Sequence, residues 1–338
     1  MKRIWIFLLC STGIFFLSTA FSGEEVNYKI NLSEYGFFEG NLADLQPAKG
    51  VFSYEINAPL FSDYAHKARF IYLPEGTAMD YQSKRVFDLP VGAAIIKNFY
   101  YHQDERKEDS PKQIMETRLL LHKKEGWIAL PYIWNEEQTD AVLEVAGGSK
   151  TIKWKNEKGK KQQIEYQVPN MVQCKGCHSY DKKLVPIGPS ARQLNMGNQL
   201  TDLAEQNLVM NLPNHEEIPQ LAQWQHPETG TIGERARAYL DGNCGHCHNP
   251  KGPASTSGMF LTTHFDDPTA LGINKAPIAA GRGAGGRIYG IVPGKPDQSI
   301  LVYRMESKDP GEMMPELGRQ MIHHQGVELV RSWIEEME

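Results

Sequence analysis

The chain has 338 residues and a formal net charge of −5 at pH 7. This acidic balance argues against nucleic acid as a partner, because the phosphate backbone attracts basic surfaces. The length predicts about two domains.

The N-terminus predicts a secretory signal peptide over residues 1–22. Basic Met1–Arg3 precedes an uncharged apolar run over 4–21, and an acidic pair follows, which is the layout of such a signal. We place cleavage after Ser22 and expect a periplasmic protein that has no membrane association once the signal is removed. An uncleaved anchor is the alternative, because the run is near the lower length limit of a spanning helix. A lipid-modified Cys10 is a weaker interpretation, since Cys10 lies inside the run.

Residues 23–170 predict a β-rich domain. Short apolar or alternating runs are separated by polar turns, a pattern typical of antiparallel hairpins. The runs lie at residues 69–73, 93–100, 116–121, 126–130 and 163–168. We interpret Asp63, His66, Glu116 and Arg118 as strand-end and surface residues rather than as a polar site.

Every cysteine after Cys10 belongs to a Cys-x-x-Cys-His pentapeptide, at residues 174–178 and 244–248. In this motif each thiol adds to one haem vinyl group, and the histidine binds the iron as its proximal ligand. We therefore predict two covalently attached haem c groups, held by Cys174, Cys177, His178, Cys244, Cys247 and His248.

Three other interpretations of the motifs are weaker. A thioredoxin-like redox pair needs no histidine and lies near a βαβ pattern, which we do not find. A zinc ribbon has its two cysteine pairs much closer together than Cys177 and Cys244. Chance pairing would have to produce the complete motif twice.

Residues 226–338 give the second motif an ordered setting. A helix-forming run over 233–240 leads into the motif, and loops rich in glycine and proline follow it. A Pro-Gly-x-Pro-Asp segment begins at Pro293, and Met314-Pro315 comes before a final helix. The apolar positions of that helix recur at intervals of three and four: Val327, Val330, Ile334 and Met337.

This region resembles a class I cytochrome c domain, in particular bacterial domains with a Pro-Gly-x-Pro-Asp-x-Ser-x-Leu … Met-Pro-x-Leu-Gly ending. The resemblance implies that the first and last helices cross and that Met314 binds the second iron opposite His248. Met313 is the rival ligand. A thioether ligand would raise the reduction potential of this haem relative to a second imidazole. We expect His323 and His324 to cap or decorate the last helix.

The N-terminal β-rich part weakly resembles the β-sheet cytochromes related to cytochrome c-prime-beta. The shared features are the order of elements and the sequence segment Asp88–Gly92. That resemblance implies a first haem lying against the sheet with an open axial face. We thus predict an α+β fold in which an N-terminal antiparallel β domain precedes an all-α class I cytochrome c domain. A first haem-attachment segment, residues 171–225, would pack on the β domain.

Nearly the whole mature chain resembles an uncharacterised bacterial family of proteins with haem motifs. The shared segments are residues 58–65, 116–119, 188–195 and 252–258, together with both motifs. The family brings no established reaction. The distal ligand of the first iron stays open, with Met196, His215 and His226 as candidates.

We expect an electron carrier that passes electrons between partners such as a periplasmic redox protein or a dehydrogenase. The alternative is a haem enzyme, peroxidase-like or small-ligand-binding, in which an open first haem is fed by the second. A third interpretation is a binding module that presents its β domain to a dehydrogenase.

Overall fold

The computed structural model describes residues 28–338. The predicted signal peptide over residues 1–22 and Cys10 therefore lie outside the described residues. No helix in the described part of the chain combines the length and the apolar character needed to cross a membrane.

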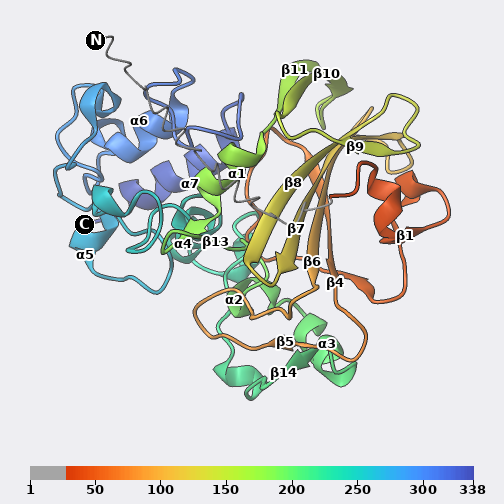
Figure 1. Cartoon of the computed structure of the whole chain (residues 1–338). Helices are drawn as coiled ribbons and strands as arrows, with labels where there is room; N and C mark the ends of the chain where they lie inside the picture. Colours follow the sequence, from red (N-terminus) through yellow and green to blue (C-terminus); the bar gives the residue numbers. More distant parts are fainter. Residues whose placement is uncertain (1–27) are drawn as a thin grey trace, which may run out of the picture.

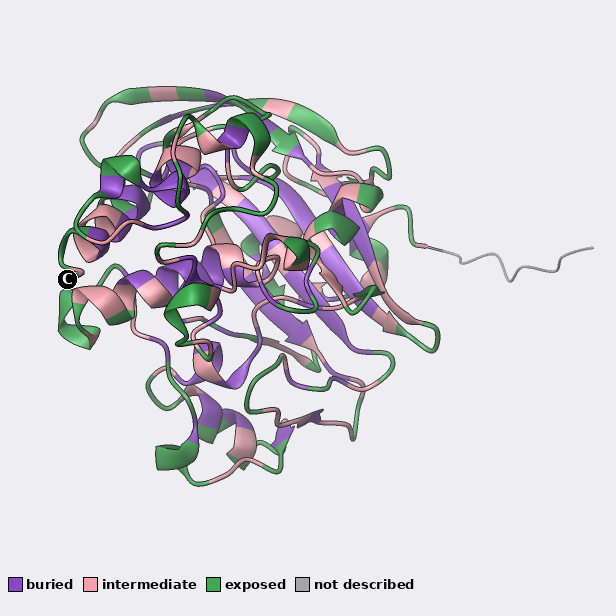
Figure 2. Cartoon of the chain, turned by 90° about the vertical axis from the view of Figure 1, so that its left-hand side faces the viewer, coloured by how far each residue is buried: buried purple, intermediate pink, exposed green. Residues whose placement is uncertain are grey.

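Six antiparallel strands form the main sheet, in the order β3-β4-β6-β7-β8-β9 (Figure 1). Central strands β6, β7 and β8 are the longest, and most of their side chains are buried (Figure 2). Such near-continuous apolar runs are expected for strands covered on both faces. The bounds are β3 (Val51–Ser53), β4 (His66–Tyr72), β6 (Ala94–His102), β7 (Lys112–Lys123), β8 (Gly126–Trp134) and β9 (Ala141–Leu143).

One face of the sheet is covered by the N-terminal segment. Leu32 and Phe37 of this segment join a buried cluster with the sheet residues Ile96, Leu119 and Tyr132. The segment contains η1 (Leu32–Tyr35), β1 (Phe38–Glu39), η2 (Leu42–Asp44) and β2 (Gln46–Pro47).

The other face is covered by the segment that carries the first motif. Ile95 and Leu120 of the sheet share a buried cluster with Cys174 and Leu194. The covering elements are α1 (Met171–Cys177), β12 (Ser179–Tyr180), β13 (Lys183–Leu184), α2 (Ala191–Leu194), α3 (Gln199–Glu205), η3 (His215–Glu217), and β14 (Val209–Met210) paired in parallel with β5 (Met79–Asp80).

A separate hairpin, β10 (Gly148–Lys155) and β11 (Lys161–Val168), leads from the sheet to α1. Its burial alternates residue by residue, because only one face meets the protein. The buried residues Trp154 and Tyr166 pack with Phe99 and Tyr101 of β6. The hairpin therefore fixes the direction from which the chain enters the first motif.

The second motif lies in a cluster of short helices and loops on the left of Figure 1. Helix α4 packs against the terminal helix α7, and Gly326 of α7 lies against the ring of Tyr239. The elements are η4 (Pro227–Thr229), α4 (Ile232–Leu240), the π-helical turn η5 (Asp241–Gly245), η6 (Ser255–Ser257), α5 (Pro268–Leu271), η7 (Gly281–Ala284), η8 (Pro296–Gln298), α6 (Ile300–Glu306) and α7 (His324–Glu335).

The predicted fold class is wrong, because residues 226–338 do not form an all-α class I cytochrome c domain. The structure has 25% helix and 26% strand, with the six-stranded antiparallel sheet as its largest element. Between the second motif and α6 the chain is mostly loop, and Ile273 forms an isolated bridge with Ile291. Glycine and proline, which disfavour helix interiors, are frequent there. The apolar core of this region also includes Ala58 and Trp224, so it is not self-contained.

Candidate functional site

The first motif forms the last turn of α1. The helix begins with a capping box in which Asn170 Oδ1 accepts from the Gln173 N–H at 2.8 Å and Gln173 Oε1 accepts from the Asn170 N–H at 2.9 Å. At its end the His178 N–H donates to the Cys174 carbonyl at 2.9 Å. Residues three and four apart share a helix face, so Cys174 lies on the same face as Cys177 and His178.

The second motif forms a turn of the same kind. Helix α4 also begins with a capping box, between Thr231 and Glu234, and it continues into the π-helical turn η5. The His248 N–H donates to the Cys244 carbonyl at 2.8 Å. Single π-helical turns inside helices are frequent at functional sites.

The two motif histidines are held by one ring nitrogen each. His178 Nδ1 lies 2.9 Å from the Val185 carbonyl oxygen, and His248 Nδ1 lies 3.2 Å from Ser257 Oγ. Both of these contacts are made through Nδ1, and the Met259 backbone also acts on the His248 ring. Burial is the largest cause that lowers the pKa of His178 to about 3 and that of His248 to about 4. Neutral imidazoles oriented through Nδ1 are typical of metal-ligating histidines.

The thiols are also available for attachment. Cys174, Cys177, Cys244 and Cys247 are all free, and Cys174 is the most buried of them. Thioether formation consumes one thiol for each vinyl group and requires no other partner. The donor set of each motif therefore fits a covalently attached haem, with Nε2 of the histidine as iron ligand.

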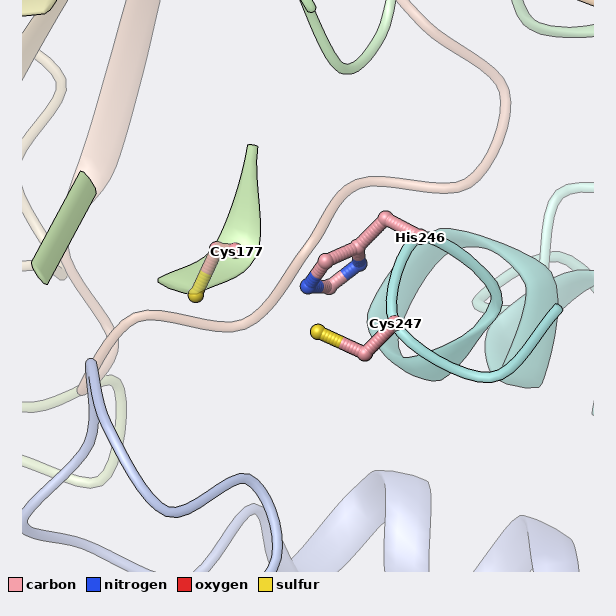
Figure 3. A group of neighbouring side chains, drawn as sticks. All are labelled: Cys177, His246 and Cys247. Atoms are coloured by element: carbon pink, nitrogen blue, oxygen red, sulfur yellow. The ribbon is translucent and has the colours of Figure 1, made fainter. Parts of the chain in front are cut away.

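The two motifs lie beside each other although Cys177 and Cys244 are far apart in the sequence. Figure 3 shows Cys177 at the end of α1 facing His246 and Cys247 from the second motif. One sulfur or ring nitrogen atom from each of these three side chains lies within 4.8 Å of the others. Cys247 Sγ lies 3.9 Å from the Gly176 carbonyl oxygen. A hydrogen bond from the Cys247 thiol is the largest cause that lowers the pKa of Cys177.

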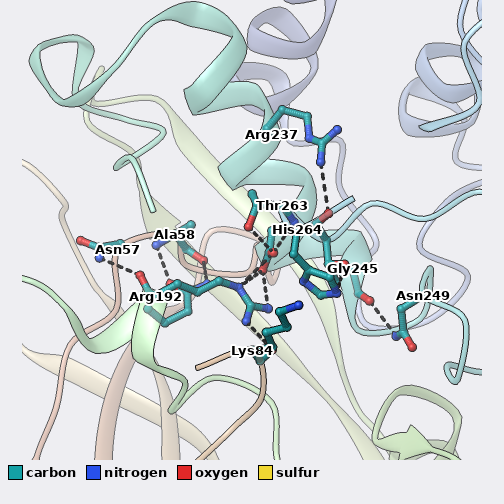
Figure 4. Close-up of polar contacts among 12 residues, drawn as sticks. Asn57, Ala58, Lys84, Arg192, Arg237, Gly245, Asn249, Thr263 and His264 are labelled. Atoms are coloured by element: carbon teal, nitrogen blue, oxygen red, sulfur yellow. Dashed lines mark hydrogen bonds and ion pairs between the residues drawn. The ribbon is translucent and has the colours of Figure 1, made fainter. Parts of the chain in front are cut away.

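An ion pair between Arg192 of α2 and Asp241 of η5 joins the second motif to the segment that follows the first motif. Arg192 Nε lies 3.1 Å from Asp241 Oδ2, and Arg192 Nη1 donates to the Lys84 carbonyl at 3.0 Å (Figure 4). Asp241 is the first residue of η5, and its carboxylate also accepts from the Thr263 N–H at 2.8 Å. A charged pair this well hydrogen-bonded positions the turn that leads into Cys244.

Segment 58–65 connects the sheet to the second region. The Phe61 N–H donates to Asn243 Oδ1 at 2.7 Å. The Asp63 carboxylate accepts from the N–H groups of Gln320 and Met321, each at 2.7 Å. Asp63 and Glu116 are both buried, so their interpretation as strand-end or surface residues is wrong. The backbone N–H groups of residues 320–321 offset the cost of burying Asp63, and the guanidinium of Arg118 offsets that of burying Glu116.

The candidate distal ligands lie in different settings. Met314 is half-buried; its N–H donates to the Arg304 carbonyl at 2.9 Å, and the positive charge of Arg304 is one of the causes that lower the pKa of His248. Met196 is half-buried in the turn between α2 and α3. Met314 therefore stays the predicted ligand of the second iron, and Met196 a candidate for the first.

His226 and His323 each have a side-chain partner outside the two motifs. His226 pairs with Glu228, and both side chains are more than half exposed. His323 is buried, stacks on Phe61 at a centroid distance of 4.2 Å, and has Nδ1 3.0 Å from Tyr239 Oη. His323 is the N-cap residue of α7 and His324 is its first residue, so their predicted place at the start of the last helix is confirmed. The His323 side chain makes no capping hydrogen bond and belongs to the core instead.

Sequence reasoning missed the residues that support the motifs. Ser257 lies in the glycine-rich segment 252–258, and its position after the motif was the available signal. Val185 acts through its carbonyl group, which leaves no signal in the sequence. His246 occupies a variable position of the second motif, and only the fold brings it to Cys177.

Comparison of the chain with family models, with curated proteins and with solved structures finds no match. The family resemblances of the sequence therefore stay predictions.

Proposed function

We propose that this protein is an exported dihaem c-type cytochrome that transfers electrons between redox partners in the periplasm. The observation that supports it best is the pair of adjacent Cys-x-x-Cys-His turns, each with free thiols and a neutral histidine held through Nδ1. An electron carrier needs no substrate cavity, but it does need redox centres that lie close to each other.

The chain's own residues divide the work between attachment and ligation. Cys174 and Cys177 would attach the first haem, and His178 would bind its iron through Nε2. Cys244, Cys247 and His248 would do the same for the second haem. When bound, the two haems supply two one-electron redox centres. Val185 and Ser257 keep the histidine rings in the orientation that leaves Nε2 free.

Haem attachment is tested by mass and absorbance. The full chain, exported from a host with a working haem-ligation apparatus, should carry the mass of two haems. Cys174→Ser with Cys177→Ser should leave one haem, and Cys244→Ser with Cys247→Ser should leave the other. A colourless product with the mass of the bare mature polypeptide contradicts the proposal.

The ligands are tested by spectroscopy on the same protein. Met314→Ala should remove the weak sulfur-to-iron charge-transfer band and lower one of the two reduction potentials, because a thioether stabilises ferrous iron. Met313→Ala is the matched control and should change neither. Carbon monoxide uptake by the reduced protein would favour the haem-enzyme alternative with an open first site; an inert protein would exclude it.

A metal site is the second candidate, and the grouping of Cys177, His246 and Cys247 favours it. Two thiolates and an imidazole are common zinc ligands, although a structural zinc site has four. The same thiols cannot hold both thioether-linked haem and zinc. Stoichiometric zinc in a haem-free product, lost in His246→Ala, would select this candidate.

A further inference from the structure

Three basic side chains stand in one row across the sheet. Arg69 of β4 is directly opposite Lys97 of β6, and Lys97 is directly opposite Arg118 of β7. Lys67 lies two residues before Arg69 and so projects from the same face. Like charges directly opposite each other destabilise a sheet. We call Lys67, Arg69, Lys97 and Arg118 the cation cluster.

The cluster holds more positive charge than its neighbours neutralise. Arg118 pairs with the buried Glu116 at 2.5 Å, and Tyr166 Oη donates to the same carboxylate at 2.6 Å. Arg69 lies 3.5 Å from Glu55, whose side chain is 61% exposed. A buried cation without a matching anion is costly, so this arrangement requires compensation.

The two lysines donate to backbone carbonyls instead of carboxylates. Lys67 Nζ donates to Leu60 at 2.7 Å and Lys97 Nζ donates to Ile187 at 3.0 Å. Burial first, and then the neighbouring cations, lower the pKa of Lys67 well below its ordinary value, and the charge of Asp63 opposes this shift. Both Asp63 oxygens already accept backbone N–H groups. Burial first, and then the neighbouring arginines, lower the pKa of Lys97 to about 7.

An unpartnered hydroxyl lies at the same place. Tyr54 is 1% exposed, and its Oη has no hydrogen-bond partner within residues 28–338. It lies next to Gly188, which follows the residue whose carbonyl accepts from Lys97. The charge of Arg69 also acts on this hydroxyl. Buried hydroxyl groups without partners are rare, and each one calls for an explanation.

The cluster also faces the first motif. The positive charges of Lys97 and Arg118 both act on His178, and that of Arg118 acts on Cys174 and Cys177. Lys67, Lys97 and Arg118 are half-buried, so they keep accessible surface. The cation cluster therefore lies close enough to the first motif for its positive charge to act on the motif side chains.

We infer that the cation cluster and the Tyr54 hydroxyl form a binding site for a carboxylate or other oxyanion beside the first motif. The acceptor oxygens of such a group match the ammonium, guanidinium and hydroxyl donors. One source is a propionate of the first haem, and this source rests on the proposed function. The other source is a free inorganic oxyanion such as phosphate or nitrite.

Two measurements on the full-length protein, exported and carrying whatever cofactor it binds, distinguish the sources. Lys97→Gln is the variant, and Lys123→Gln, at the exposed end of β7, is the matched control. If the site holds a propionate, Lys97→Gln lowers one of the two reduction potentials, and added phosphate gives no saturable rise in melting temperature. If the site takes a free oxyanion, phosphate and nitrite raise the melting temperature saturably, and Lys97→Gln abolishes this rise.

Tyr54→Phe keeps the ring and removes only the hydroxyl. It should weaken phosphate binding about tenfold or more, or lower the same reduction potential, because hydrogen bonds to charged groups contribute about 1.5–3 kcal/mol. If Lys97→Gln and Tyr54→Phe both match Lys123→Gln in the two measurements, the inference is overturned. Phosphate titration needs no haem, so failure of haem attachment and failure of the anion site are read separately.

Discussion

The first motif lies between an apolar cluster and the cation cluster, whereas the second follows the Arg192–Asp241 ion pair and packs on a separate apolar cluster. After burial, the sheet cations Lys97 and Arg118 help to lower the pKa of His178, whereas Arg304 is the cation that does so for His248. Cys244 packs on a cluster that includes Leu240, Leu261 and Val302. The same backbone turn thus meets two electrostatic environments, which would give two attached redox groups different potentials.

The Arg192–Asp241 ion pair, which joins the two regions, gives the largest expected loss of stability. Arg192→Met should lower the free energy of unfolding by about 3–5 kcal/mol, because it leaves the Asp241 carboxylate buried without its cation. Arg282→Met, in an exposed pair with Asp309, is the control and should cost less than about 1 kcal/mol. Urea denaturation measures both, and equal losses would show that the buried pair does not hold the second motif in place.

Acid should destabilise the second region through His323. Burial is the largest cause that lowers its folded pKa from 6.5 to about 4, so the unfolded chain binds more protons between these values. The stability that comes from the neutral imidazole is complete above pH 6.5 and is lost as pH falls toward 4, by about 3 kcal/mol.

His323→Phe keeps the stacking on Phe61 and removes the titrating group. Its free energy of unfolding should fall less between pH 7 and pH 4 than that of the natural chain. His226→Phe, at a more exposed histidine, is the control and should keep the full slope. Identical slopes for all three proteins would exclude His323 as the acid-sensitive group.

The glycine in each motif gives a matched pair of substitutions. A Cβ added at Gly245 would lie 2.8 Å from Thr262 Cγ2, whereas one added at Gly176 would have Leu317 Cδ1 as its nearest contact, at 3.9 Å. Gly245→Ala should cost about 1–3 kcal/mol through overpacking. Gly176→Ala should cost nothing, because alanine favours the helix. Thermal melts measure the difference, and equal melting temperatures would contradict the tighter packing of the second motif.

Ser257→Ala gives the smallest effect. It removes the hydrogen bond to His248 Nδ1 and should cost about 1 kcal/mol; if the proposed haems are attached, it should also shift the spectrum of one of them slightly. His178 should be unaffected, since its partner is the Val185 carbonyl. Thr256→Ala, exposed in the same turn, is the control. An unchanged spectrum would show that Ser257 does not orient the imidazole.

The sequence by itself determined the local structure. Alternating and apolar runs place β4, β6, β7, β8 and β11 where strands are predicted, because side-chain periodicity follows directly from backbone geometry. The spacing of the four cysteines and two histidines puts each motif on one helical turn. The order of elements in residues 226–338 did not determine their fold. The order of helix, motif, glycine-rich and proline-rich loops and final helix is also that of a class I cytochrome c domain, but here the segments pack differently.

Only the tertiary structure decided which distant groups meet. Cys177 reaches His246 and Cys247 because η5 is held by segments 58–65 and 188–195, and Cys174 of α1 shares a buried cluster with Leu194 of the second segment. No local pattern reveals these contacts. The cation cluster depends on strand register, and a shift by one residue would turn its side chains to the other face. Long-range contacts of this kind depend on the packing of the whole chain, and periodicity in one segment carries no information about them.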